Sequence, residues 1–78
     1  MGNKNKNFDD AYFRRLIVRY LEKYRVACRR EIDELLMKKL SDVLSEQQKK
    51  NKITYLLSYL RIHNVIMVNE KKKWILVK

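Results

Sequence analysis

The sequence has no proline, and its only glycine is Gly2. Because these residues end helices and form tight turns, their absence from the interior favours long helices joined by short connections. No apolar run approaches the length of about 18 residues that a membrane-spanning helix needs, so we expect no membrane segment. One cysteine cannot form a disulfide within the chain. That composition is typical of a reducing compartment, and we expect a cytoplasmic protein.

Residues for catalysis and metal binding are also scarce. His63 is the only histidine and Cys28 the only cysteine, which is too few for a structural zinc site. A glycine-rich phosphate loop cannot be built without interior glycine. A redox role for Cys28, beside Arg29 and Arg30, is a weak alternative. We therefore expect no enzymatic activity and no cofactor.

Acidic residues are rare in the C-terminal part of the chain. The net charge is +10, and residues 47–78 hold eight Lys or Arg against one acid, Glu70, for +7. Residues 1–46 hold eleven basic and eight acidic residues, for +3. This asymmetry favours a polyanionic partner over an evenly charged, solvated surface.

Seventy-eight residues, 46% of them hydrophobic, suffice for one small domain. We expect a disordered tail over residues 1–7, which are rich in Asn and Lys, and a folded domain over residues 8–78. Within that domain, apolar residues recur every three or four positions over 9–24, 29–40 and 46–62. This spacing predicts three amphipathic helices.

Capping residues mark the borders of these helices. Ser45 and Gln48 have the spacing of a capping box at the start of the helix 46–62. Cys28 takes the same place before the preceding helix, where Ser or Thr would accept a better hydrogen bond. Asn64 suits a left-handed stop after the last helix.

The final segment is rich in β-branched residues. The apolar runs Val65–Val68 and Trp74–Val77 are separated by NEKKK, which predicts an antiparallel hairpin. Alternation places Trp74 and Leu76 on one face, and we expect that face to be buried. The connector at Val26 would add a third strand to this sheet.

Three helices followed by a hairpin, in about 70 residues, is the order of a winged helix-turn-helix. We therefore expect an α+β fold, mostly α, with the two-stranded β-hairpin as the wing. The helix 46–62 would be the recognition helix, with its leucines facing the core and its polar side facing a DNA major groove. Val43 and Leu44, in the turn before it, are expected to reach into the core.

These features predict a non-enzymatic domain that binds double-stranded DNA, and we expect a role in transcription regulation. Amide and hydroxyl side chains can contact base edges, and lysines can neutralise phosphates. The expected DNA-binding residues are Gln48, Lys49, Lys50, Asn51, Lys52, Thr54, Tyr55 and Ser58 on the helix 46–62, Arg29 and Arg30 at the start of the preceding helix, and Lys71, Lys72 and Lys73 at the wing tip.

Other interpretations of the same residues stay open. A protein-interaction winged helix, as a homodimer or as a docking module of a larger regulator, would use Tyr55, Tyr59 and Ile62. Binding of RNA or single strands through the tyrosines is a third hypothesis. An ordinary solvated turn is a separate alternative for the basic run Lys71–Lys73.

A longer pattern runs through residues 12–76. Its residues are Arg29, Arg30, Glu31–Asp33, Leu35, Leu36, Lys39–Leu44, Gln48–Lys50, Lys52, Ile53, Leu56, Leu57 and Trp74. This pattern resembles the C-terminal winged-helix segment of a group of bacterial transcriptional regulators, also described as helicase-related ATP-binding proteins, that carry a Schlafen-like AlbA-type domain at the N-terminus. The resemblance implies a DNA-binding or regulatory module, with further domains in a longer parent chain.

Overall fold

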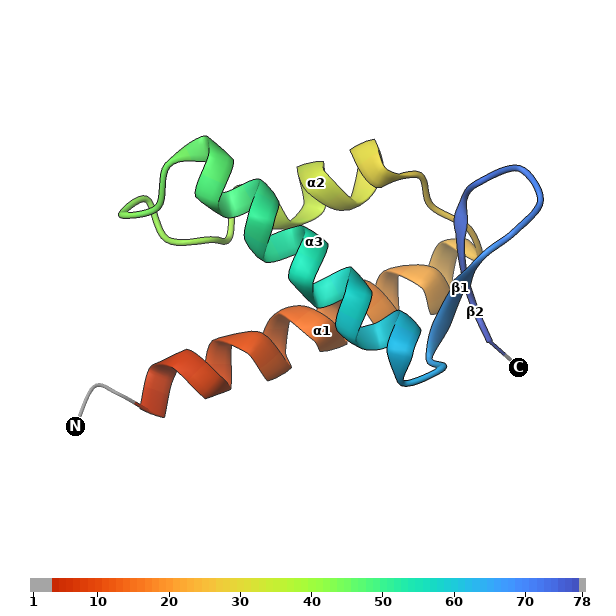
Figure 1. The fold of residues 1–78 in the computed structure, drawn as a ribbon, viewed down its shortest axis with the longest axis horizontal. Helices are drawn as coiled ribbons and strands as arrows, with labels where there is room; N and C mark the ends of the chain where they lie inside the picture. Colours follow the sequence, from red (N-terminus) through yellow and green to blue (C-terminus); the bar gives the residue numbers. More distant parts are fainter. Residues whose placement is uncertain (1–3, 78) are drawn as a thin grey trace.

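The computed structural model describes residues 4–77. These residues form the helices α1 (Lys4–Tyr24), α2 (Arg29–Met37) and α3 (Glu46–Ile62), followed by the strands β1 (Ile66–Val68) and β2 (Trp74–Leu76). The strands make a two-stranded antiparallel sheet. Figure 1 shows α3 lying across α1, with the hairpin at the end where α3 stops. The predicted α+β layout of a winged helix-turn-helix is confirmed.

Helix α1 is longer than the sequence pattern predicts. It begins at Lys4 instead of near residue 9, so residues 4–7 of the expected tail are helical, and residues 1–3 lie outside the described residues. No proline or glycine interrupts the chain after Gly2, so the helix can extend beyond its apolar face. Asp10, expected near the helix start, therefore lies within the helix.

Helix α2 is shorter than predicted. It ends at Met37 instead of residue 40 because the chain tightens there: the Lys39 and Leu40 N–H groups both donate to the Leu36 carbonyl, at 2.9 and 3.0 Å. This turn carries Leu40 into the core, where it is 5% exposed. The hydrophobic spacing had included Leu40 because it is buried, although it lies beyond the helix.

Helix α3 has the predicted bounds. The Gln48 N–H donates to Ser45 Oγ at 3.1 Å, and the Ser45 N–H donates to Gln48 Oε1 at 2.8 Å, which completes the capping box. At the other end Asn64 has φ 60°, the left-handed conformation expected of a helix stop. The sequence at both ends thus fixes the length of the helix.

The core lies where the three helices meet the sheet. Helix α3 contributes its whole apolar face, so the predicted inward orientation of its leucines is confirmed. No helix within residues 4–77 has the length and apolar character to span a membrane. The buried residues are Phe13, Ile17, Leu21, Ala27, Ile32, Leu36, Leu40, Ile53, Leu56, Leu57, Leu60 and Ile66.

The hairpin packs on this core through one face. Its register pairs Met67 with Ile75, and Trp74 and Leu76 contact the core as predicted. The connector after α1 joins the sheet at one position: Ala27 and Trp74 exchange backbone hydrogen bonds of 3.0 and 2.7 Å. The predicted third strand therefore exists as a single bridge, and it fixes the wing against the helices.

The turn between α2 and α3 differs from the expectation. Val43 was predicted to enter the core, but it is 90% exposed, and Leu44 is only half-buried. The turn closes when the Leu44 N–H donates to the Ser41 carbonyl at 3.0 Å and the Val43 N–H to Ser41 Oγ at 3.2 Å. The turn leaves the Val43 side chain in solvent.

Candidate nucleic-acid interface

The side of α3 opposite its leucines is exposed. The exposed side chains on this side form a surface that we call the α3 outer face. They are Gln47, Lys50, Asn51, Thr54, Tyr55 and Ser58. Tyr55 is 51% exposed, so it is not buried beneath the wing. This set combines amides, hydroxyls and one lysine, and it contains no acid. Such groups can donate to and accept from base edges and phosphates.

Two amides of this face are joined. Gln47 Nε2 donates to Asn51 Oδ1 at 3.1 Å, one helical turn apart. Gln47 was not among the predicted site residues, although its spacing from Asn51 could have suggested it. Gln48, which was predicted to contact DNA, uses its side-chain oxygen in the capping box with Ser45. The outer face therefore presents Gln47 with Asn51, and Gln48 serves the helix start.

The three lysines near the start of α3 have different surroundings. Lys49 Nζ lies 3.4 Å from Asp42 Oδ1, and its side chain is only 14% exposed. Lys52 forms an ion pair with Asp10 of α1. Lys50 is exposed and has no ion pair within the described residues. Of these predicted phosphate contacts, Lys50 is therefore the best placed to meet an external anion.

Arg29 joins α2 to α3. Its Nε donates to Asp33 Oδ1 at 2.7 Å, and its Nη2 donates to the Lys50 carbonyl at 3.1 Å and to Thr54 Oγ1 at 3.0 Å. Most of its donors are thus occupied within the fold, as is the Thr54 hydroxyl, which also donates to the Lys50 carbonyl. Arg29 positions α3, a role that the prediction of a phosphate contact did not include.

Arg30, the neighbour of Arg29, has a different position. Its side chain is exposed, and no hydrogen bond or ion pair within residues 4–77 involves it. The adjacent Cys28 N–H donates to Glu31 Oε1 at 2.9 Å at the same helix start. Arg30 thus keeps its guanidinium available for an anion, whereas the Nε and Nη2 groups of Arg29 are bound within the fold.

Aromatic contacts cover the C-terminal end of α3. The Arg14 guanidinium lies over the Tyr59 ring at 4.2 Å from its centroid, and the His63 ring lies 4.2 Å from the same ring. Tyr59 also packs against the core. Its ring is therefore covered, whereas Ile62 beside it is 75% exposed.

The wing tip is organised by Asn69. Its Oδ1 accepts from the backbone N–H groups of Lys71 and Lys73, at 2.9 and 3.0 Å. Lys72 takes φ 63° at the end of the turn, where its N–H donates to the Asn69 carbonyl at 2.9 Å, and all three lysine side chains are exposed. The predicted basic tip is present, and Asn69 positions its backbone, a role that loop composition alone does not indicate.

No group of three or more His, Cys, Asp or Glu side chains that could hold a metal ion occurs within residues 4–77. No protein-family model, curated protein or solved structure matches this chain. The function therefore has to be inferred from the chemistry of the exposed surfaces, and the resemblance to bacterial regulators stays a hypothesis.

Proposed function

We propose that this protein is a winged-helix module that binds double-stranded DNA, with the α3 outer face in the major groove. The observation that carries this proposal is the exposed row of amides and hydroxyls around Lys50, free of acids and supported by buried leucines. A major groove admits an α-helix, and Asn or Gln amides pair well with adenine edges. Asn51, joined to Gln47, is the residue best suited to such a contact.

Basic residues outside this face would contact the DNA backbone. Arg30 is exposed at the start of α2, and Lys71–Lys73 are exposed at the wing tip. Phosphate contacts of this kind position a protein on duplex DNA and supply most of its salt-dependent affinity. We propose a role in transcription regulation in the cytoplasm, without catalysis, which agrees with the resemblance to bacterial regulators.

A protein-interaction function is the second candidate. Ile62 is 75% and Tyr55 51% exposed on the same helix, and exposed apolar side chains of this size favour contacts between proteins. Tyr59, which the sequence had placed in the same patch, lies under Arg14 and packs on the core. The apolar patch is therefore smaller than the sequence suggested, and DNA binding is the better supported function.

The proposal is tested by fluorescence anisotropy with a labelled duplex of mixed sequence at several salt concentrations. We expect saturable binding whose affinity falls with salt, with a log–log slope of about −0.9 for each phosphate neutralised. Single strands and RNA of the same sequence should bind more weakly. The absence of duplex binding at low salt contradicts the proposal, and a tight dimer that covers α3 in sedimentation experiments would support the second candidate instead.

A further inference from the structure

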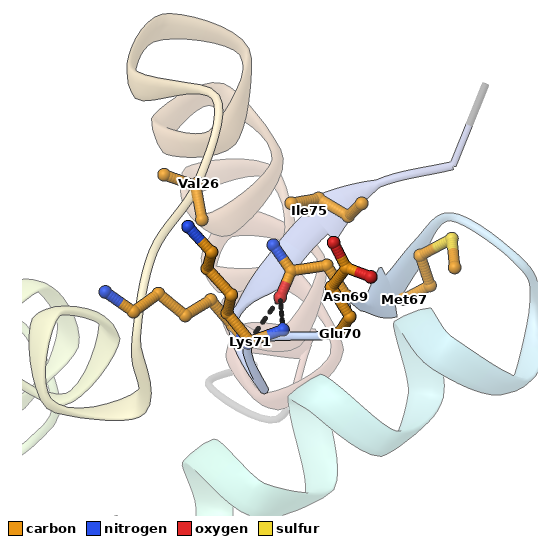
Figure 2. Close-up of a pocket in the computed structure, with 7 residues that line it drawn as sticks. Val26, Met67, Asn69, Glu70, Lys71 and Ile75 are labelled. Carbon is orange, nitrogen blue, oxygen red and sulfur yellow. Dashed lines mark hydrogen bonds between the residues drawn. The ribbon is translucent and has the colours of Figure 1, made fainter.

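The solvent side of the hairpin carries a groove. Its floor is formed by the side chains of Val26, Met67 and Ile75, and its rim by Asn69, Glu70, Lys71 and Lys73. We call this set the wing groove (Figure 2). It lies on the opposite face of the hairpin from Trp74 and Leu76, which contact the core. It shares no residue with the α3 outer face.

The floor of the wing groove is unusually apolar for a solvent-facing sheet surface. Met67 and Ile75 are paired across the two strands, and Val26 lies beside them next to the Ala27–Trp74 bridge. Met67 is 44% and Val26 38% exposed. Antiparallel sheets usually place polar residues on the solvent side, so contiguous apolar residues there indicate a contact surface.

The rim supplies positive charge from a turn whose backbone is held in place. Asn69 holds the backbone of Lys71 and Lys73 through hydrogen bonds of 2.9 and 3.0 Å. Figure 2 shows Lys71 extending toward the Val26 side of the groove, with Glu70 on the Met67 side. Neither lysine forms an ion pair in the part of the chain that the structure describes, despite the nearby Glu70. Two ammonium groups therefore stand unneutralised beside an apolar floor.

We propose that the wing groove binds an extended segment of an acidic partner protein, in which an apolar side chain is flanked by carboxylates. The apolar side chain would lie on Val26, Met67 and Ile75, and the carboxylates would meet Lys71 and Lys73. Burial of the floor would supply affinity, and the charges would supply specificity and a faster association rate.

Two other obvious occupants fit the wing groove less well. A second copy of this chain also carries +10, and a symmetric contact would bring the Lys71 and Lys73 side chains of both copies together. Like charges opposed in this way oppose association. Duplex DNA could meet the two lysines through phosphates, but the small deoxyribose surfaces between its hydrated phosphates would cover little of Met67 and Ile75.

The wing groove uses two of the lysines that the proposed DNA-binding function also assigns to backbone contacts. An acidic segment bound there would neutralise Lys71 and Lys73 and would compete with the wing for DNA. The α3 outer face does not enter this inference. The groove is therefore tested in the absence of DNA, so that its failure leaves the DNA proposal untouched.

The test is a titration of ¹⁵N-labelled protein with a blocked eight-residue peptide in which Leu and Phe alternate with Glu, followed by NMR and calorimetry. We expect saturable shifts at the amides of Val26, Met67, Ile75 and Lys71. The double variant K71Q/K73Q should bind about tenfold more weakly, as expected for two lost charged contacts. Lys72→Gln is the control from the same turn, because it removes one positive charge and Lys72 does not line the groove; it is compared with each of the single variants Lys71→Gln and Lys73→Gln.

Several results would overturn the inference. One is an equal loss of peptide affinity in Lys72→Gln and in K71Q/K73Q. Another is an unchanged affinity when Gln replaces Glu in the peptide. A third is that the amide resonances shifted by the peptide belong to α3. A concentration-dependent dimer that Met67→Gln abolishes would identify a second copy as the occupant. If a short duplex shifts the amide resonances of the floor residues and binds more tightly than the peptide, nucleic acid is the occupant. If the inference holds, Met67→Gln should leave the spectrum outside the wing unchanged and should weaken peptide binding. That result would show that the floor contributes to the affinity.

Discussion

Neighbouring lysines of α3 have different partners, and this decides what each can do. Lys49 lies near Asp42, Lys52 pairs with Asp10, and Lys50 is left exposed. The sequence could locate this basic cluster, because no acid follows Glu46 for the rest of the helix. It could not show that Lys52 turns inward, because Asp10 approaches only when α1 and α3 pack together.

Two further residues illustrate the same limit. Val43 is apolar and follows a helix, so sequence reasoning placed it in the core, whereas the turn geometry leaves it 90% exposed. Arg29 looked like a surface cation, whereas three acceptors from two helices surround its guanidinium. Residue type and spacing show whether a side chain is apolar or charged and which element carries it, but the contacts of the side chain depend on tertiary packing.

Tyr20 provides a prediction on pH. Burial, and to a lesser extent the nearby Glu31, raise the pKa of Tyr20 above its ordinary value of 10.0. The folded state therefore holds this proton more tightly than the unfolded state. The stabilisation is fully present below pH 10 and is lost as the pH rises through the pKa of the folded state.

We expect the wild type to lose more unfolding free energy than Tyr20→Phe between pH 9 and pH 11, near the ordinary tyrosine pKa. Urea denaturation at each pH measures the difference, and Tyr55→Phe is the control because Tyr55 is exposed. Parallel stability curves for the wild type and Tyr20→Phe would contradict the prediction.

At the scale of the elements, local signals determined what could be predicted. The bounds of α3 follow from the Ser45–Gln48 capping box and from Asn64, all of which act on their own backbone. The hairpin follows from its β-branched runs to within one residue at each end. The predicted start of α1 and the predicted end of α2 were wrong, because hydrophobic spacing alone does not fix a helix boundary.

The hydrogen bonds by which Arg29 joins α2 to α3 yield a second prediction. Arg29→Ala should lower the unfolding free energy by about 1–2 kcal/mol, because it leaves Asp33 and Thr54 without their shared donor. Arg29→Lys should restore little of this, because an ammonium cannot match the guanidinium fork.

Arg30→Ala is the control for this prediction, since Arg30 is exposed and should change stability by no more than about 0.5 kcal/mol. Chemical denaturation of the three variants and the wild type measures the difference. Equal stabilities of Arg29→Ala and Arg30→Ala would show that Arg29 does not hold the two helices together.

At the scale of the whole molecule, which has a net charge of +10, the fold places some basic side chains in ion pairs and leaves others exposed without one. Ion pairs with acids occupy Arg29, Lys49 and Lys52, whereas Lys50 and the wing-tip lysines stay available within the described residues. The sequence predicted a basic C-terminal half and a polyanionic partner. It could not divide that charge between the α3 outer face and the wing groove, which the packing of the hairpin separates.

The central claim is that the outer side of α3 meets duplex DNA, and comparison of Lys50→Gln with Lys52→Gln tests it most directly. Both variants remove one positive charge from the same helix, but only Lys50 faces outward, whereas Lys52 pairs with Asp10. The slope of log affinity against log salt is measured for each by anisotropy with the same duplex. We predict that Lys50→Gln reduces the slope by about 1 and that Lys52→Gln leaves it unchanged while lowering stability. Equal slopes for Lys50→Gln and the wild type, or a loss confined to Lys52→Gln, would contradict the account.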